Sequence, residues 1–141
     1  TIASLARQWK IPAQLIYNVN ASKIPDPNEL TPGVELKLIE GPFYAELDTQ
    51  GQSMTLFLSD MYAGSFEIQS TPGILTGEYV IVDKSAQDRI DRPFCIKLNS
   101  GVSIYANPNA PAANDEVVLK PVEAEEIFSI LSAASRIRVL R

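Results

Sequence analysis

Short runs of alternating apolar and polar residues, which begin at residue 43, are the feature that most constrains this fold. Side chains of a strand point alternately to its two faces, so each run predicts a strand with one buried face. The runs cover residues 43–48, 54–59, 64–68, 78–83, 94–98 and 102–105. Residues 49–52 contain a glycine between the first two runs, which predicts a hairpin. Several short strands joined by turns predict a β-sandwich or a small barrel.

One helix and one further strand are expected near the end of this β-rich segment. Lys120-Pro121 places a proline at the first helical position, where its missing N–H costs nothing. The predicted apolar face of the helix consists of Ala124, Ile127, Phe128 and Leu131. Residues 136–139 then alternate arginine with isoleucine or valine, which predicts a closing strand.

The first forty residues have a different pattern. Thr1 is a suitable N-cap, and Ile2, Leu5, Ala6 and Trp9 follow at helical spacing. Pro12 is suited to open a second helix, whose apolar face consists of Leu15, Ile16 and Val19. Residues 34–39 alternate like a strand. Two helices this short need a strand behind them, so a further strand is expected before Thr1, and the absence of an initial Met suggests part of a longer chain.

Composition excludes several classes of protein. The chain has 17 acidic and 12 basic side chains, a net charge of -5, and its basic residues are scattered, which argues against a nucleic-acid surface. It contains no apolar run long enough to span a bilayer. The single cysteine, Cys95, cannot form an internal disulfide, so the cysteine count does not indicate a compartment.

Residues 1–40 resemble a LysM domain, whose order is strand, helix, helix, strand. The resemblance rests on Thr1-Ile2, Leu5-Ala6, Leu15-Ile16, Asn20 and residues 30–38, which include the Pro-Gly turn. Only the last residue of the family's opening strand and turn would be present here, so the first strand is missing. LysM modules bind peptidoglycan or other glycans that contain N-acetylglucosamine. By position, the resemblance implies a glycan-binding site at Thr1, Ile2, Asp26, Pro27 and Leu30. The alternative is that these residues only cap helices and form turns.

Residues 42–141 resemble an L,D-transpeptidase catalytic domain, a mainly β fold that cross-links peptidoglycan stem peptides through an acyl-cysteine. The similarity lies in residues 45–48, 54–58, 62–68, 76–81, 96–104, 124–131 and 135–137. A LysM module followed by such a domain is a known arrangement. The whole is therefore expected to be an α+β protein with domains at 1–40 and 42–141.

The chain departs from the L,D-transpeptidase pattern at both chemical positions. Tyr105-Ala106 stands where the family has His-Gly. Counting back from the predicted helix, Glu116 stands where the nucleophilic cysteine is expected and Val118 where an arginine is expected. The resemblance thus implies a degenerate cleft lined by Tyr105, Ala106, Asn107, Glu116 and Val118.

These replacements are expected to remove the chemistry. A cysteine nucleophile needs a base to form the thiolate, and the chain contains no histidine. Cys95 precedes the lost histidine position on a predicted strand, on the face opposite Phe94, Ile96 and Leu98, and is expected to be an inert structural side chain. Asp115 and Glu116 are expected at a solvated loop edge. Neither a metal site nor a cofactor is predicted.

Glu123, Glu125 and Glu126 are likewise expected at a solvated helix start. The leading hypothesis is an inactive L,D-transpeptidase-like protein of the bacterial cell envelope that binds peptidoglycan or organises wall proteins. One alternative is an enzyme of wall metabolism with an unrecognised or partner-completed site. Another is a module that binds a peptide or protein segment beside Tyr105, Asn107 and Glu116.

Overall fold

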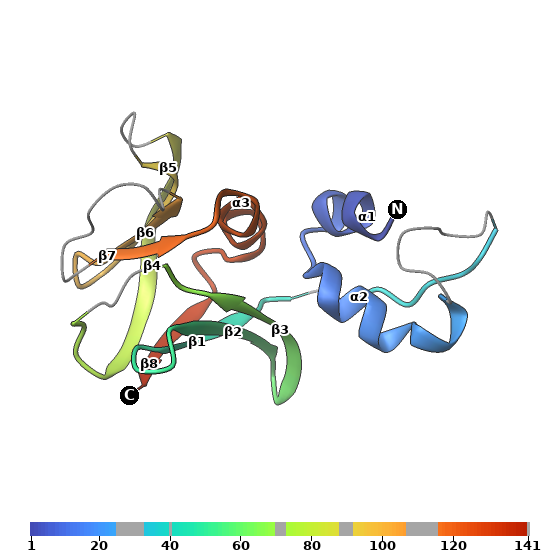
Figure 1. Ribbon diagram of the computed structural model, residues 1–141, viewed down its shortest axis with the longest axis horizontal. Helices are drawn as coiled ribbons and strands as arrows, with labels where there is room; N and C mark the ends of the chain where they lie inside the picture. Colours follow the sequence, from blue (N-terminus) through green and yellow to red (C-terminus); the bar gives the residue numbers. More distant parts are fainter. Residues whose placement is uncertain (25–32, 40, 70–72, 88–91, 107–115, 141) are drawn as a thin grey trace.

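The computed structural model describes residues 1–24, 33–39, 41–69, 73–87, 92–106 and 116–140. Its helices are α1 (Ile2–Trp9), α2 (Ala13–Val19) and α3 (Pro121–Ile130), with a short 3₁₀ turn, η1, at Ala21–Lys23. Its strands are β1 (Tyr44–Asp48), β2 (Ser53–Leu58), β3 (Met61–Glu67), β4 (Gly77–Gln87), β5 (Pro93–Leu98), β6 (Ser103–Ala106), β7 (Glu116–Leu119) and β8 (Arg136–Leu140). Figure 1 shows the helical N-terminal part beside the β-rich remainder.

The strands form one sheet in the order β3-β2-β1-β8-β4-β5-β6-β7. The predicted hairpin is confirmed, because β1 and β2 pair antiparallel from Tyr44 opposite Phe57 to Asp48 opposite Ser53. Asp48 closes its turn by accepting the N–H groups of Gln50 and Gly51 at 3.1 and 2.9 Å. The predicted closing strand is also confirmed: β8 buries Ile137 and Val139 between exposed arginines.

The sheet bends on itself, so that its two outermost strands approach each other. Strand β4 changes register between Ile81 and Asp83 and belongs to both halves of the sheet. At the far edges Ile68 bridges Leu119, and the N–H of Gln69 donates to the carbonyl of Val118 at 2.7 Å. The architecture is therefore mainly β, as predicted.

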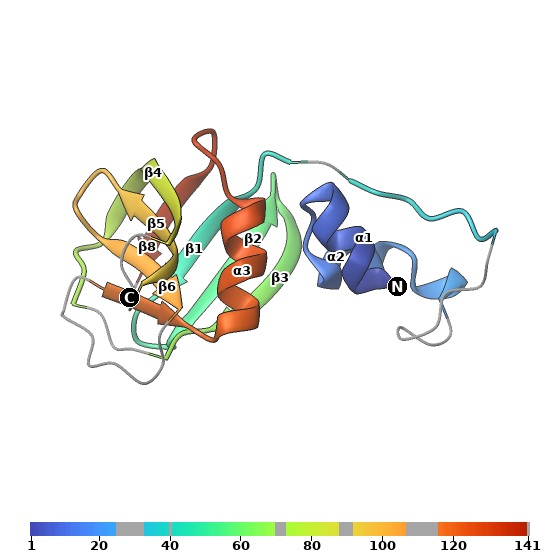
Figure 2. The same ribbon diagram turned by 90° about the horizontal axis from the view of Figure 1, so that it is seen from above.

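Helix α3 lies between the two halves of the sheet (Figure 2). It begins after Lys120 with Pro121 in its first turn. Of its predicted apolar face, Ala124, Ile127 and Leu131 are buried and Phe128 is half-buried, and Ile130 is buried as well. At its other end the Lys84 ammonium donates to the carbonyls of Phe128 and Leu131 at 2.6 and 2.8 Å. These bonds satisfy carbonyls left open at the helix end. Burial, and to a lesser extent Lys10, lowers the pKa of Lys84.

The two predicted N-terminal helices are confirmed. Thr1 caps α1 through a reciprocal pair of bonds with Ser4, and the helix buries Ile2 and Ala6, while Trp9 stays 45% exposed. Helix α2 buries Leu15 and Ile16. No helix among the described ranges is long and apolar enough to cross a bilayer.

The predicted strand at residues 34–39 is wrong, since this segment forms no strand. A strand needs a neighbouring backbone for its ladder of hydrogen bonds, and here a side chain takes that place. The buried Asn20 amide accepts the Lys37 N–H at 2.6 Å and donates to the Lys37 carbonyl at 2.8 Å. The same amide donates to the carbonyl of Ile16 at 2.8 Å, which fixes this segment beside the end of α2.

The helices pack directly against the β-rich part and share its hydrophobic core. The Gln14 side chain pairs with the backbone of Ser65 in strand β3, accepting its N–H and donating to its carbonyl, both at 3.1 Å. Glu126 of α3 accepts the N–H of Ala13 at 3.0 Å. The expectation that Glu126 is solvated is therefore wrong, because this carboxylate is half-buried between two helices. The boundary near residue 41 stays a prediction.

Candidate functional site

The outer face of β6 and β7 brings together three of the residues predicted for the degenerate cleft, Tyr105, Glu116 and Val118. The two strands pair in parallel, with Ser103 beside Glu116 and Tyr105 beside Val118. Alternate residues such as Ile104 and Val117 belong to the main core, because neighbours along a strand point to opposite faces. Tyr105, Glu116 and Val118 therefore share one side of the strand pair, whereas Ala106 points to the main core on the other side.

Tyr105 and Glu116 contact each other directly, since the tyrosine hydroxyl donates a hydrogen bond to Glu116 Oε2. Arg92, just before β5, completes the group: its Nη2 lies 3.1 Å from the same oxygen, and its guanidinium lies 5.1 Å from the Tyr105 ring centroid. Arg92 Nη1 also donates to the Ser103 hydroxyl at 3.5 Å. We refer to Arg92, Ser103, Tyr105 and Glu116 as the Arg92 cluster.

The Arg92 cluster is largely buried. Tyr105 is 3% exposed and Glu116 is 9% exposed. The expectation of a solvated loop edge at Glu116 is wrong, because Glu116 begins strand β7, in which all four residues are buried. A carboxylate is tolerated at such a position when a cation and hydrogen-bond donors accompany it. Here Arg92 and Tyr105 supply them.

The remaining predicted cleft positions are also packed where the structure describes them. Ala106 is 3% exposed and Val118 is 2% exposed, while Asn107 lies outside the described residues. The sequence analysis did not predict Arg92 or Ser103. Arg92 directly precedes β5 and Ser103 is the first residue of β6, and no sequence motif marks either position. The one available signal was a basic residue shortly before a buried strand, and that pattern is too common to single out a site.

Cys95 lies beside this cluster in strand β5. Its side chain is 1% exposed and packs with Tyr105 and Val118, in a group separate from the main core. Ile96 and Leu98 belong to the main core, so the predicted placement of Cys95 on the opposite strand face is confirmed. A thiol buried in this way has little access to a substrate. Its inertness stays a prediction.

The predicted glycan-binding residues are only partly described. The Thr1 hydroxyl is engaged with Ser4 in the helix cap, and Ile2 is 5% exposed. Asp26, Pro27 and Leu30 lie outside the described residues. Thr1 and Ile2 thus cap and pack helix α1, and glycan binding at these positions stays a prediction.

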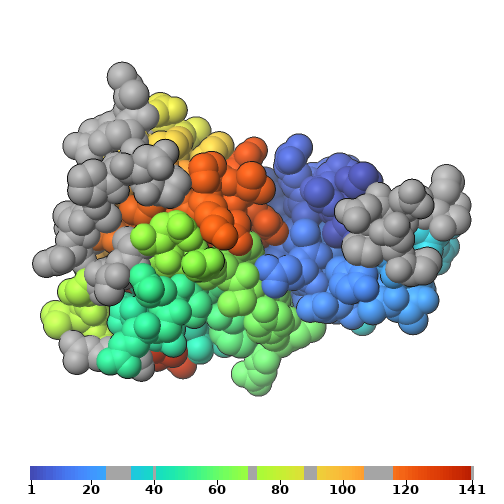
Figure 3. Space-filling view, viewed as in Figure 1, coloured from blue at the N-terminus to red at the C-terminus, as the bar shows by residue number. Residues whose placement is uncertain are grey.

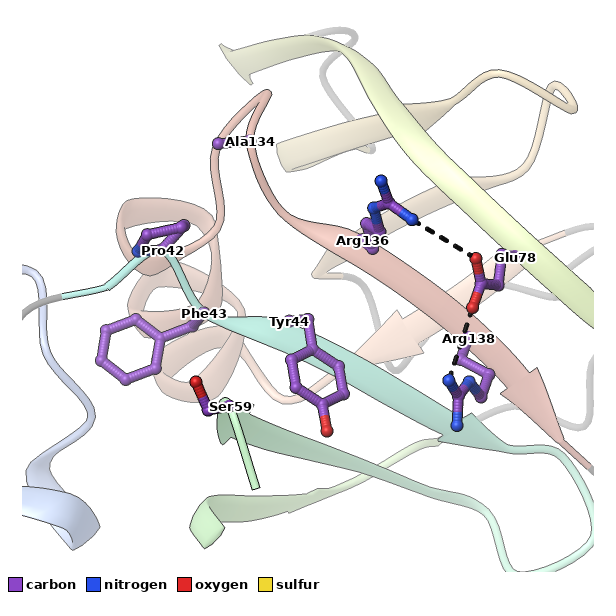
Figure 4. A pocket seen from close by; sticks show the side chains of 8 residues that line it. All are labelled: Pro42, Phe43, Tyr44, Ser59, Glu78, Ala134, Arg136 and Arg138. Atoms are coloured by element: carbon purple, nitrogen blue, oxygen red, sulfur yellow. Dashed lines mark hydrogen bonds and ion pairs between the residues drawn. The ribbon is translucent and has the colours of Figure 1, made fainter. Parts of the chain in front are cut away.

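Hollows in the surface occur away from the Arg92 cluster. The outer face of β1, β8 and β4 carries one of about 380 Å³ (Figure 4). Two others lie beside the N-terminal helices, one of about 140 Å³ against α3 and one of about 420 Å³ against Tyr62. Among the described residues no three His, Cys, Asp or Glu side chains gather in a group that could hold a metal ion.

Solved structures share this arrangement of strands and helix. L,D-transpeptidase 1 of Mycobacterium tuberculosis matches 70% of this chain with 62% of its own, at a TM-score of 0.58 and 12% identity. A mutant L,D-transpeptidase of Enterococcus faecium matches 69% of this chain with 49% of its own, at a TM-score of 0.56 and 15% identity. An L,D-transpeptidase from Mycobacterium smegmatis matches 71% with 59%, at a TM-score of 0.58 and 11% identity.

The chain has an L,D-transpeptidase-like fold. It spans about half to three fifths of the length of the solved chains it matches. No family model matches the sequence, and no curated protein matches it. The expected L,D-transpeptidase-like architecture is therefore confirmed as a fold, and the Arg92 cluster lies on the outer face of strands β6 and β7 of that fold. The LysM resemblance stays a prediction.

Proposed function

We propose that this protein is a catalytically inactive L,D-transpeptidase-like protein of the bacterial cell envelope that binds peptidoglycan or organises wall proteins. The observation that carries the proposal is the Arg92 cluster. Glu116, which replaces the nucleophile in the resemblance, is buried and engaged by Tyr105 and Arg92.

The chemistry of acyl transfer supports inactivity. The reaction needs a nucleophile that can reach the substrate carbonyl and a base that takes its proton. The sequence has no histidine, and its one thiol, Cys95, is 1% exposed. A carboxylate is a weak nucleophile toward an amide, and that of Glu116 already accepts a hydrogen bond from Tyr105 and faces the Arg92 cation. The burial of Cys95 and the contacts of Glu116 therefore support the proposal that neither side chain acts as the nucleophile.

A role at the wall is supported by the fold and by the N-terminal helices. The three matching structures named above are L,D-transpeptidases. Helices α1 and α2, with Asn20 at the end of α2, follow the helical part of the LysM pattern. Helix α2 contacts β3 through Gln14 and α3 through the Ala13–Glu126 hydrogen bond, which would hold a glycan-binding element at a fixed place on the domain.

Sedimentation with purified insoluble peptidoglycan tests the binding part of the proposal. The full chain should be retained in the pellet and be released by soluble wall fragments. The matched control is Lys120→Ala, because Lys120 is exposed and pairs with Glu67 of β3, and this variant should be retained equally. Loss of retention for the unaltered chain, with no wall protein captured by it, would contradict the proposal.

A further inference from the structure

The hollow on the outer face of β1, β8 and β4 combines an apolar end with a charged end. Figure 4 shows Pro42, Phe43 and Ala134 at one end and Arg136, Glu78 and Arg138 at the other. Tyr44 and the exposed Ser59 lie along its lower side. Its volume of about 380 Å³ falls within the range of about 300–1,000 Å³ that is usual for small-ligand sites.

The charges in this hollow are balanced by neighbouring groups. Glu78 lies between the two arginines, with Arg136 Nη1 at 3.7 Å and Arg138 Nη2 at 3.4 Å from its oxygens. Arg138 Nη1 lies 3.7 Å from Glu46. Two cations and two carboxylates leave no net charge locally, and the whole chain carries -5. This balance favours an uncharged ligand over a polyanion.

These ion pairs are long and exposed, so they are easily exchanged for bonds to a ligand. Arg136, Arg138 and Glu78 side chains are 73%, 50% and 53% exposed, respectively. Guanidinium and carboxylate groups are planar forks that can donate to and accept from neighbouring hydroxyl groups. Because Glu78 holds both arginines on one face of β4 and β8, donors and acceptors alternate across a short distance.

An aromatic surface adjoins this polar row. The Tyr44 ring stacks on Phe57 with centroids 5.3 Å apart and planes 20° apart, which fixes the ring while it lines the hollow. Phe57 in turn meets the Tyr62 ring edge-on at 6.4 Å. A ring held in place presents an apolar surface at low entropic cost to the C–H face of a sugar.

We propose that this hollow is a binding site for an uncharged oligosaccharide, with hydroxyl groups bound by Arg136, Glu78 and Arg138 and a sugar face on Tyr44. The site lies on β1, β4 and β8, whereas the Arg92 cluster lies on β6 and β7, and it shares no residue with the positions that the LysM resemblance implies. The inference extends the proposed role at the wall by adding a second glycan contact, and it rests on that role only for its biological setting.

Titration of the full chain with a neutral N-acetylglucosamine tetrasaccharide, followed by backbone amide NMR shifts, tests the site. Saturable shifts are expected at Tyr44, Glu78 and Arg138. Arg136→Ala and Tyr44→Leu should each raise the dissociation constant about tenfold, which corresponds to about 1.4 kcal/mol. The matched control is Lys120→Ala, an exposed cation in a comparable surface pair with Glu67, which should leave the constant unchanged.

Each outcome has a distinct meaning. The absence of shifts at the hollow, shifts confined to residues 1–24, or equal affinity of both variants and the unaltered chain would overturn the site. Tighter binding of a polyuronate than of the neutral sugar would overturn the assignment to an uncharged ligand. Binding at the hollow with neither retention on peptidoglycan nor capture of a wall protein would support the site and contradict the proposed function. Retention on peptidoglycan with no shifts at the hollow would support the proposed function and contradict the site.

Discussion

The hydroxyl of Tyr105 donates a hydrogen bond to the carboxylate of Glu116 across the parallel strands β6 and β7. These two residues occupy the positions that the family resemblance assigns to a base and a nucleophile. Arg92 joins them by an ion pair at 3.1 Å and a ring contact at 5.1 Å. The tyrosine hydroxyl, the carboxylate and the Arg92 Nη groups therefore contact one another in a largely buried cluster, whereas the buried Arg92 Nε has no hydrogen-bond partner among the described residues.

Removal of the Glu116 carboxylate should destabilise the protein markedly. Glu116→Ala leaves the Arg92 guanidinium, whose side chain is 18% exposed, without its anion. Loss of one partner of a buried pair costs about 3 kcal/mol of unfolding free energy. Tyr105→Phe, which removes only the hydroxyl, should cost about 1 kcal/mol. Urea denaturation measures both, and a Glu116→Ala variant as stable as the unaltered chain would show that the cluster does not hold β6 and β7 together.

The thiol of Cys95 should be protected in the folded protein. Because its side chain is 1% exposed, a disulfide-exchanging reagent can reach it only when β5 opens locally. The exposed position in Ala133→Cys, made in a Cys95→Ala background, is the control and should react about a hundredfold faster or more. Equal rates, or a stable adduct of Cys95 with an acylating β-lactam detected by mass spectrometry, would refute its inert role.

Asn20 should be the most sensitive polar position of the N-terminal part. Its amide makes three hydrogen bonds, to the carbonyl of Ile16 and to both backbone groups of Lys37, and the residue is 2% exposed. Asn20→Ala leaves these groups unpaired and should lower the free energy of unfolding by about 2 kcal/mol. Asn18→Ala, on the exposed side of the same helix, is the control. If neither change altered the melting temperature, the result would contradict a stabilising role for the Asn20–Lys37 hydrogen bonds.

Glu126 should contribute a pH dependence to stability. Burial raises the pKa of this carboxyl above its ordinary value of 4.5, although the Ala13 N–H partly opposes the shift. A raised pKa means that the folded state holds the proton more tightly, so this contribution is full below pH 4.5 and is lost as pH rises through the folded pKa.

The variant Glu126→Gln isolates this effect. Its amide oxygen can still accept the Ala13 N–H, but it does not titrate. As pH rises above 4.5, the melting temperature of the unaltered chain should therefore fall relative to that of Glu126→Gln. Burial also raises the pKa of Glu123, and this part of its shift cancels because both proteins contain Glu123, whereas the smaller part that comes from the Glu126 charge is removed together with Glu126. A difference that stays constant with pH would contradict the buried placement of Glu126.

The alternating runs predicted most strands because a strand with one buried face carries apolar and polar side chains at alternate positions. The alternation of Arg136 and Arg138 with Ile137 and Val139 is an example, and β8 shows that pattern of burial. Strand β7 was missed because it is buried on both faces and begins with a carboxylate, so neither alternation nor composition marks it.

Side-chain partners far apart in sequence account for the other errors. Residues 34–39 have a strand pattern, but the Asn20 side-chain amide hydrogen-bonds both the N–H and the carbonyl of Lys37. Glu126 belongs to an acidic helix start that usually faces water, yet Ala13 uses it as an acceptor. The family resemblance was enough to predict that Tyr105 and Glu116 lie in one cleft. It gave no indication of Arg92, whose contacts with them are seen only in the structure.

Incubation of the purified chain with tetrapeptide-containing muropeptides, followed by mass spectrometry of the products, tests inactivity most directly. An active L,D-transpeptidase serves as the positive control for the substrate. With Glu116 enclosed by Tyr105 and Arg92, the account predicts no cross-linked dimer and no acylated protein. A cross-linked product that forms in proportion to the amount of this chain would contradict inactivity, and Cys95→Ala would then show whether Cys95 or another residue forms it.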